Sequence, residues 1–283
     1  MARSTRTRPR PPRRAQSATA IPAGVAPNVP TVTAPENPLR PGMPALDSIH
    51  SRLVIASPQT PGRTYTILRT TEIDGYELEK ATAAGLAAPG VLAPVPTGDN
   101  FQGTARKAAK LSISTAPTES FNDLSILLKS LPADSTMASL HPPITTTATS
   151  NRVAKEKRNI RLKAFLYAAS HEADNDFHLI IGRDPANLPE MYMTMELSGL
   201  PPTTAKSFAK LKAARNAHKG FFSTNLPGMT YDFYHPPIPI AVEGSLFFDM
   251  THATGQRPGP PSLKSRMPTI WEVHPITGIA FEP

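Results

Sequence analysis

The alternation of apolar and polar residues after residue 155 constrains the fold of this chain more than any other feature. Runs rich in β-branched and aromatic residues alternate with period two, which is typical of β-strands. One stretch between them has helical spacing, and we expect Thr203 or Thr204 to cap this helix and Gly220 to end it. The expected strands are residues 159–170, 176–182, 190–197, 238–250 and 269–282, and the expected helix is residues 203–219.

This order of three strands, one helix and two strands is the arrangement of the OB-fold, a small five-stranded barrel with its helix between strands three and four. We therefore predict a mainly β (α+β) fold with an OB-like barrel. The alternative is another β-rich α+β domain, because five short strands and one helix also occur in other small folds.

The 33 prolines of this 283-residue chain set the region apart from a less regular first half. Proline is disfavoured in helix interiors and central strands. We predict three parts: a disordered Arg/Pro-rich tail at residues 1–50, a linker-rich extended arm at 51–150, and the OB-like domain at 151–283.

Within the arm, residues 52–80 carry β-branched and aromatic residues around turn signals, which predicts two strands that form a hairpin or lie on the main domain. Residues 83–118 are rich in Ala, Pro, Gly and Thr and read as a linker. The stretch "TESFNDLSILLKSLPA" predicts a short helix with Ser120 as its cap. The chain has no cysteine, which excludes disulfides and thiolate metal sites. No run approaches the roughly 20 apolar residues of a membrane span.

The net charge of +8 is concentrated at the amino terminus. Six arginines precede residue 15, which leaves 24 basic residues (30 minus 6) against 22 acidic ones in the rest of the chain. Such a tail binds polyanions weakly and nonspecifically. It has some features of an organelle transit peptide, but its prolines disrupt an amphipathic helix and no secretory apolar core follows, so we predict a cytoplasmic protein. The arginines are Arg3, Arg6, Arg8, Arg10, Arg13 and Arg14.

Carboxylates and imidazoles recur on or beside the expected strands. Positions two apart on a strand face the same side, so Asp176 shares a face with His178, and Glu272 with His274. Imidazole and carboxylate groups bind zinc, manganese or iron when three or four converge at about 2.0–2.2 Å. This predicts a divalent metal site at His178, His252, Glu272 and His274. The complete polar set is Asp174, Asp176, His178, Asp249, His252, Glu272 and His274.

Two other roles for this set stay open. Glu272 and His274 have a structural role if the carboxylate anchors a loop amide and the imidazole donates to a carbonyl, as buried polar groups require. Contact with a ligand or substrate is the other. In an OB barrel the second and fifth strands are not neighbours, which argues against a four-ligand site.

Three segments resemble motifs of a group of uncharacterised bacterial proteins. These are "DNDFHL", "FFDMTHATGQ" and "WEVHP", which match an Asp-x-Asp-x-His-Leu strand, a Phe-Phe-Asp-x-x-His segment with a Gly-rich loop, and a closing Glu-x-His-Pro strand. The resemblance covers residues 155–283 and implies a shared β-rich fold and a shared site. It implies no activity.

Two classes of function fit these observations. The first is a binding module, in which an OB-like barrel engages a polar ligand, a peptide or a nucleic acid through the loops at 170–175 and 249–268. The second is a metal-dependent hydrolase that uses the His/Glu/Asp cluster, with no catalytic residue assigned. The residues expected to bind the ligand are Asp174, Asp176, His252, Gln256, Arg257, Lys264 and Arg266.

Two weaker patterns each have a functional and a structural explanation. The basic residues of the expected helix, at 206–219, either contact phosphates or form a solvated face. The aromatic residues at 231–235 either stack on bases or cover one end of a barrel.

Overall fold

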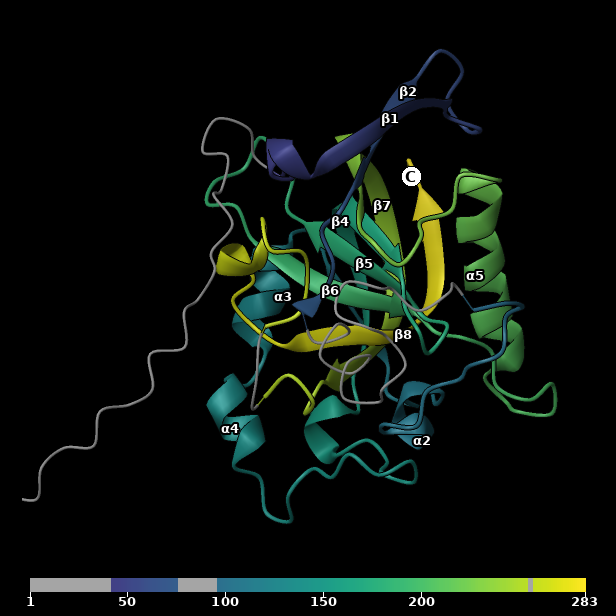
Figure 1. Ribbon diagram of the computed structural model, residues 1–283. Coiled ribbons are helices and arrows are strands. Elements are labelled where there is room, and N and C mark those ends of the chain that lie inside the picture. Colours follow the sequence, from purple (N-terminus) through teal and green to yellow (C-terminus); the bar gives the residue numbers. More distant parts are fainter. Residues whose placement is uncertain (1–41, 76–95, 254–256) are drawn as a thin grey trace, which may run out of the picture. The chain divides into compact units, whose positions relative to one another are not determined.

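The computed structural model describes residues 42–75, 96–253 and 257–283 (Figure 1). These residues form a mainly β structure with a few helices, and eight strands share one sheet. The mainly β prediction is therefore confirmed. The arginine tail and Gln256 lie outside the described residues.

The sheet has the strand order β1-β2-β7-β8-β6-β5-β4-β3, with an additional pairing between β7 and β4. Its strands are β1 (Ile49–Ala56), β2 (Thr64–Thr70), β3 (Thr118–Phe121), β4 (Asn159–His171), β5 (Phe177–Gly182), β6 (Tyr192–Leu197), β7 (Asp232–Phe248) and β8 (Trp271–Phe281). The helices are α2 (Lys107–Lys110), α3 (Leu124–Ser130), α4 (Asp134–Ala138) and α5 (Phe208–Phe222), with 3₁₀ turns η1 (Leu46–Ser48), η2 (Ala154–Glu156) and η3 (Lys264–Arg266).

The carboxy-terminal half has the predicted order of three strands, one helix and two strands. The strand β4 pairs with β5, and β5 pairs with β6, both antiparallel. The strand β6 pairs with β8 in parallel. The strand β7 runs antiparallel to both β8 and β4. Every residue of β5 and β6 is buried, which explains why apolar side chains occupy both faces of these strands.

Three strands from the first half of the chain extend the sheet beyond the five that the sequence predicts. The expected hairpin forms from β1 and β2, and β2 then pairs with the start of β7 from Thr66↔His235 to Arg69↔Asp232. The strand β3 lies parallel to the start of β4. The 17-residue β7 is longer than the 11-residue β8, so its first residues have an edge to which β2 binds.

Two helix boundaries differ from the sequence prediction. The helix α5 starts after Ser207 and continues through Gly220 to Phe222. Phe221 stacks on Phe281 of β8 at 4.2 Å between ring centroids, and this packing extends the helix past the glycine; Figure 1 shows α5 beside β8. The helix α3 is capped by Asp123, whose carboxylate accepts from the Ser125 amide.

The expected linker at 83–118 also contains ordered structure. Residues 83–95 lie outside the described residues, but α2 follows, and the side chains of Arg106 and Lys110 are buried. No helix in the described ranges is both long enough and apolar enough to span a bilayer.

Candidate metal centre

Three neighbouring strands, β5, β6 and β8, place acidic and imidazole side chains on one buried face. His178 on β5 lies directly opposite Glu196 on β6. Glu272 on β8 lies opposite Thr194, two residues before Glu196, so both glutamates face the same side of the sheet. The exposed fractions are 1% for His178, 3% for Glu196 and 0% for Glu272. These ionisable groups are therefore removed from bulk water.

The ligand atoms of this region fall into three groups, in each of which all atoms lie within 4.8 Å of one another. Glu196 belongs to two of the groups, and Glu272 also belongs to two. The shared glutamates therefore join the groups into one continuous cluster. The groups are Asp176, Glu196 and His274; His178, Glu196 and Glu272; and Asp249, His252 and Glu272.

His178 has one ring nitrogen held by a carboxylate and the other without a hydrogen bond. Its Nδ1 lies 2.6 Å from Oε1 of Glu172, which follows the end of β4. A carboxylate only accepts, so Nδ1 carries the proton and a neutral ring has its lone pair on Nε2. Nε2 is buried and has no hydrogen-bond partner among the described residues. Metal-binding histidines typically have this arrangement, with the far ring nitrogen donating to a carboxylate.

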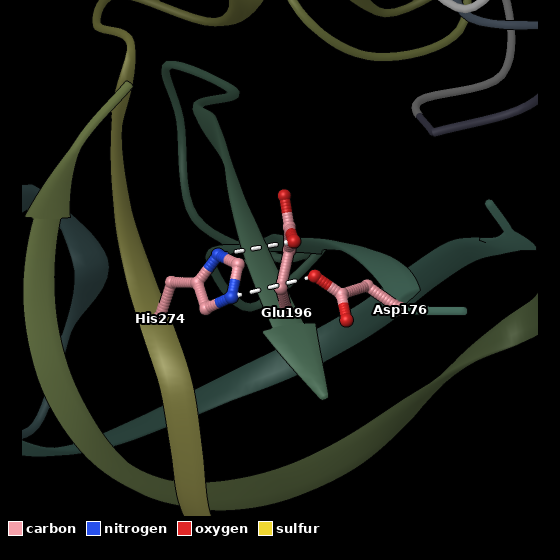
Figure 2. A group of neighbouring side chains, drawn as sticks. All are labelled: Asp176, Glu196 and His274. Atoms are coloured by element: carbon pink, nitrogen blue, oxygen red, sulfur yellow. Dashed lines mark ion pairs between the residues drawn. The ribbon is translucent and has the colours of Figure 1, made fainter. Parts of the chain in front are cut away.

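His274 lies between two carboxylates that come from different segments (Figure 2). Its Nδ1 is 3.0 Å from Oε2 of Glu196, and its Nε2 is 3.4 Å from Oδ2 of Asp176. Neither contact has hydrogen-bond geometry. The expected structural contacts of this strand are also absent from the described residues, because neither oxygen of Glu272 accepts a hydrogen bond there.

Seven buried atoms of the cluster have no hydrogen-bond partner among the described residues. Buried polar groups are hydrogen-bonded in the great majority of cases, and each exception costs about 1–3 kcal/mol. Carboxylate oxygens and imidazole nitrogens that converge without hydrogen bonds are suited to a shared cation. The atoms are Asp176 Oδ2, His178 Nε2, Glu196 Oε2, Glu272 Oε1 and Oε2, and His274 Nδ1 and Nε2.

One protein cation lies at the Asp176 end of the cluster. The Nζ atom of Lys110, the last residue of α2, is 3.4 Å from Asp174, 3.9 Å from Asp176 and 3.7 Å from Glu196. Burial alone lowers the pKa of Lys110, but the charges of these carboxylates outweigh it and hold the pKa well above its ordinary value. The lysine therefore stays charged and compensates this part of the cluster.

The pKa values locate the part of the cluster with least positive charge. Burial opposes ionisation of Glu196, but His274 and Lys110 outweigh it and hold the pKa of this carboxyl well below its usual value. Burial raises the pKa of Glu272 well above its usual value, and the charges of Glu196 and Asp249 add to the effect. Glu272 is therefore the carboxylate that gains most from an added cation.

Asp249 and His252 follow the end of β7 and extend the cluster toward a pocket. Oδ2 of Asp249 lies 3.7 Å from Nε2 of His252. Oδ1 of Asp249 accepts from the amide and hydroxyl of Thr251 at 2.8 and 2.5 Å. His252 also lines a pocket of about 240 Å³. The other lining residues are Asp134, Ser135, Ala138, Ala253, Arg257 and Ile270.

The residues predicted to bind a ligand through the loops are dispersed. Arg257 lines the pocket together with His252, and it donates to the Met267 carbonyl at 2.9 Å. Asp174 pairs with Lys110, as described above. Arg266 pairs with Glu190, and Lys264 lies beside it in η3. Of the predicted set, the described residues bring only His252 and Arg257 to this pocket.

Three residues of the centre have no place in the sequence prediction: Lys110, Glu172 and Glu196. Glu196 had a detectable signal, because an acid occupies an otherwise apolar strand that the sequence predicts to be buried. Glu196 also supplies the contact between β5 and β8, because β6 lies between these strands.

The comparisons with known proteins give no relative for this chain. No protein-family model, curated protein or solved structure matches it.

Proposed function

We propose that this protein is a metal-dependent hydrolase that binds a divalent ion through Nε2 of His178 and the carboxylates of Glu196 and Glu272. The carrying observation is the state of His178: its Nδ1 donates to Glu172, and its buried Nε2 has no hydrogen-bond partner among the described residues. Two carboxylates lie within 4.8 Å of the ligand atom of this ring. Nitrogen and oxygen donors without thiolate suit zinc or manganese.

Three protein ligands leave a coordination position for water or substrate, as in catalytic zinc sites. A divalent ion in such a site lowers the pKa of its water and polarises an ester or phosphoryl oxygen. The protein contributes a site removed from bulk solvent and a neighbouring pocket at His252. Hydrolysis requires no further cofactor, which is why we favour it.

The distribution of charge favours this group over the one around His274. Lys110 compensates Asp176 and Glu196 within 3.9 Å. Among the described residues, Glu272 pairs within 4 Å only with the imidazole of His274, at 3.6 Å. A divalent ion between His178 and Glu272 therefore supplies positive charge where the protein supplies least.

We further propose that β4 to β8 form an OB-like five-stranded barrel, which supports a second candidate function. The pairings β4–β5–β6–β8–β7–β4, with α5 between β6 and β7, support this proposal. The second candidate is a binding module that engages a polar ligand, a peptide or a nucleic acid. The exposed guanidinium of Arg257 beside the pocket supports an anionic ligand.

The test is metal analysis of the purified full chain after incubation with zinc or manganese and removal of excess ion. We expect about one ion or more per chain, and loss of the ion bound by His178 in His178→Ala. The matched control is His218→Ala, because His218 is also fully buried, without hydrogen bonds, but packs against Phe177 and Phe222. Absence of stoichiometric metal from the wild-type protein would overturn the proposal.

Hydrolysis of p-nitrophenyl esters of phosphate and carboxylic acids separates the two functions. A hydrolase turns over at least one ester class, and chelator or His178→Ala abolishes the turnover. Bound metal without turnover of any class would favour the binding module.

A further inference from the structure

The cluster contains a second group of metal-ligand atoms, closer to the pocket than the first. We propose that Asp249, His252 and Glu272 bind a second divalent ion, and that the Glu272 carboxylate bridges it to the ion at His178. This inference rests on the proposed function, because it requires the first ion. It makes the site a two-metal centre of the kind in which paired ions lie about 3.5–4 Å apart.

Glu272 has the properties of a bridging carboxylate. It is the one residue common to the His178 group and the His252 group. Its exposed fraction is 0%, and both of its oxygens lack hydrogen bonds among the described residues. A carboxylate that binds one ion needs one oxygen, and the second oxygen then normally accepts a hydrogen bond. Two buried oxygens without such bonds are suited to two ions.

The turn after β7 orients Asp249 and His252 toward the same point. The Thr251 amide and hydroxyl occupy Oδ1 of Asp249, which leaves Oδ2 on the side of the imidazole. The amide of His252 donates to the Asp249 carbonyl at 3.2 Å and closes the turn. The two ligands are thus fixed before any ion binds, which lowers the entropic cost of binding.

A buried ion pair fixes the start of this turn. Arg106 and Glu156 form two hydrogen bonds of 2.7 and 2.8 Å. Arg106 also donates to the carbonyl of Phe248, and Glu156 accepts from the amide of Phe248, each at 2.9 Å. The residue that precedes Asp249 is therefore held on both of its backbone polar groups. A ligand pair on a fixed backbone meets the geometric requirement of a metal site.

The second ion is the one that meets substrate. His252 lines the pocket, whereas His178 and Glu196 do not. Arg257 lines the same pocket and provides a cation for an anionic group of the substrate. The ion at His178 then has mainly an electrostatic and orienting role, and the ion at His252 contacts the group that reacts.

Manganese titration of the full chain tests the number of ions and their separation. We expect about two manganese ions per chain, with an electron paramagnetic resonance spectrum of an exchange-coupled pair. His252→Ala should bind about one ion and give the spectrum of isolated manganese. Asp249→Asn, which keeps the shape of the side chain, should do the same, and circular dichroism checks that both variants fold. His141→Ala is the control, because His141 is an exposed histidine outside the cluster.

The outcomes distinguish this inference from the proposed function. A wild-type protein that binds one ion, with His252→Ala unchanged in stoichiometry, overturns the second site and leaves the His178 site standing. A wild-type protein that binds no ion overturns both. Two ions without exchange coupling overturn the bridging role of Glu272.

Discussion

Glu172 accepts the Nδ1 proton of His178 at 2.6 Å, across the turn that joins β4 to β5. The two residues are six positions apart, so a single hairpin supplies both the proposed ligand and the group that orients it. The contact fixes the ring tautomer in which Nε2 faces Glu196 and Glu272. It also increases the basicity of Nε2.

The first prediction concerns this contact. Glu172→Gln should lower the affinity for zinc or manganese about 10–100-fold, because the orienting carboxylate is lost while the ligands remain. Competition with a fluorescent chelator measures the change. Glu119→Gln is the control, since Glu119 pairs with Arg158 on the surface. Equal affinity in Glu172→Gln and wild type would contradict the orienting role.

The second prediction concerns the buried lysine. Lys110→Met should destabilise the metal-free protein by about 3–5 kcal/mol, because it leaves buried carboxylates without their cation. Chemical denaturation in the presence of chelator measures the free energy of unfolding. Lys107→Met is a matched control from the same short helix, since Lys107 is exposed. If the two variants unfold alike, Lys110 does not compensate the cluster.

The third prediction concerns stabilisation by metal. An ion that binds the folded chain alone stabilises it by about 2.7 kcal/mol at one hundred times its dissociation constant. For a chain of this size the melting temperature should rise by about 2–4 °C for each kcal/mol. Thermal unfolding with added manganese or with chelator measures the rise. The variant His178→Ala should lose the shift that belongs to its ion, while His218→Ala should keep it.

The fourth prediction concerns pH. Burial raises the pKa of Asp232 to about 7 from an ordinary value of 3.8, and Arg69 opposes this only in part. Between these two values the folded chain keeps a proton that the unfolded chain has released. Stability from this group is therefore complete below pH 4 and is lost as the pH rises to 7, by about 1.4 kcal/mol per pH unit.

Asp232→Asn should remove this contribution and flatten the pH dependence relative to wild type. Denaturation at several pH values between 4 and 8, with chelator present, measures the difference in slope. Glu243→Gln, on a partly exposed residue of the same strand, is the control and should leave the slope unchanged. A parallel pair of curves for Asp232→Asn and wild type would show that Asp232 is ionised at low pH in the folded chain.

The fifth prediction concerns polyanions. Two basic residues of α5, Arg215 and Lys219, pair with Asp99, which reduces the charge that this helix offers to phosphates. Deleting residues 1–14 should therefore remove most salt-sensitive binding to DNA, together with a salt dependence of up to about 5 in log–log slope. Fluorescence anisotropy at several salt concentrations measures both. Unchanged affinity after the deletion would move the binding surface to the folded part.

The sequence predicts the strands and the helix of the carboxy-terminal half because their periodicity is local. It also predicts that Asp176 and His178 share a face, and that Glu272 and His274 do. It does not predict the three added strands, because pairing of β2 with β7 depends on contacts more than 160 residues apart. The eight-stranded sheet is therefore larger than the expected five strands.

The prediction of the site is incomplete for a similar reason. Lys110 lies in a stretch whose composition is that of a linker, and tertiary contacts of α2 place its ammonium group in the cluster. Glu196 carries the signal of an acid in an apolar strand, but only the order of the sheet shows that it lies between His178 and Glu272. Separation along the chain therefore conceals the centre more than residue type does.

The parallel contact between β6 and β8 consists of two register pairs, Thr194↔Glu272 and Met195↔Val273, fewer than join any other two strands of the sheet within the described residues. Backbone hydrogen bonding is thus least extensive along the seam that the glutamates flank. A divalent ion held by Glu196 and Glu272 would act as a clasp across this seam. The seam would open more readily without it, so hydrogen–deuterium exchange of the β6 and β8 amides would report occupancy of the site directly.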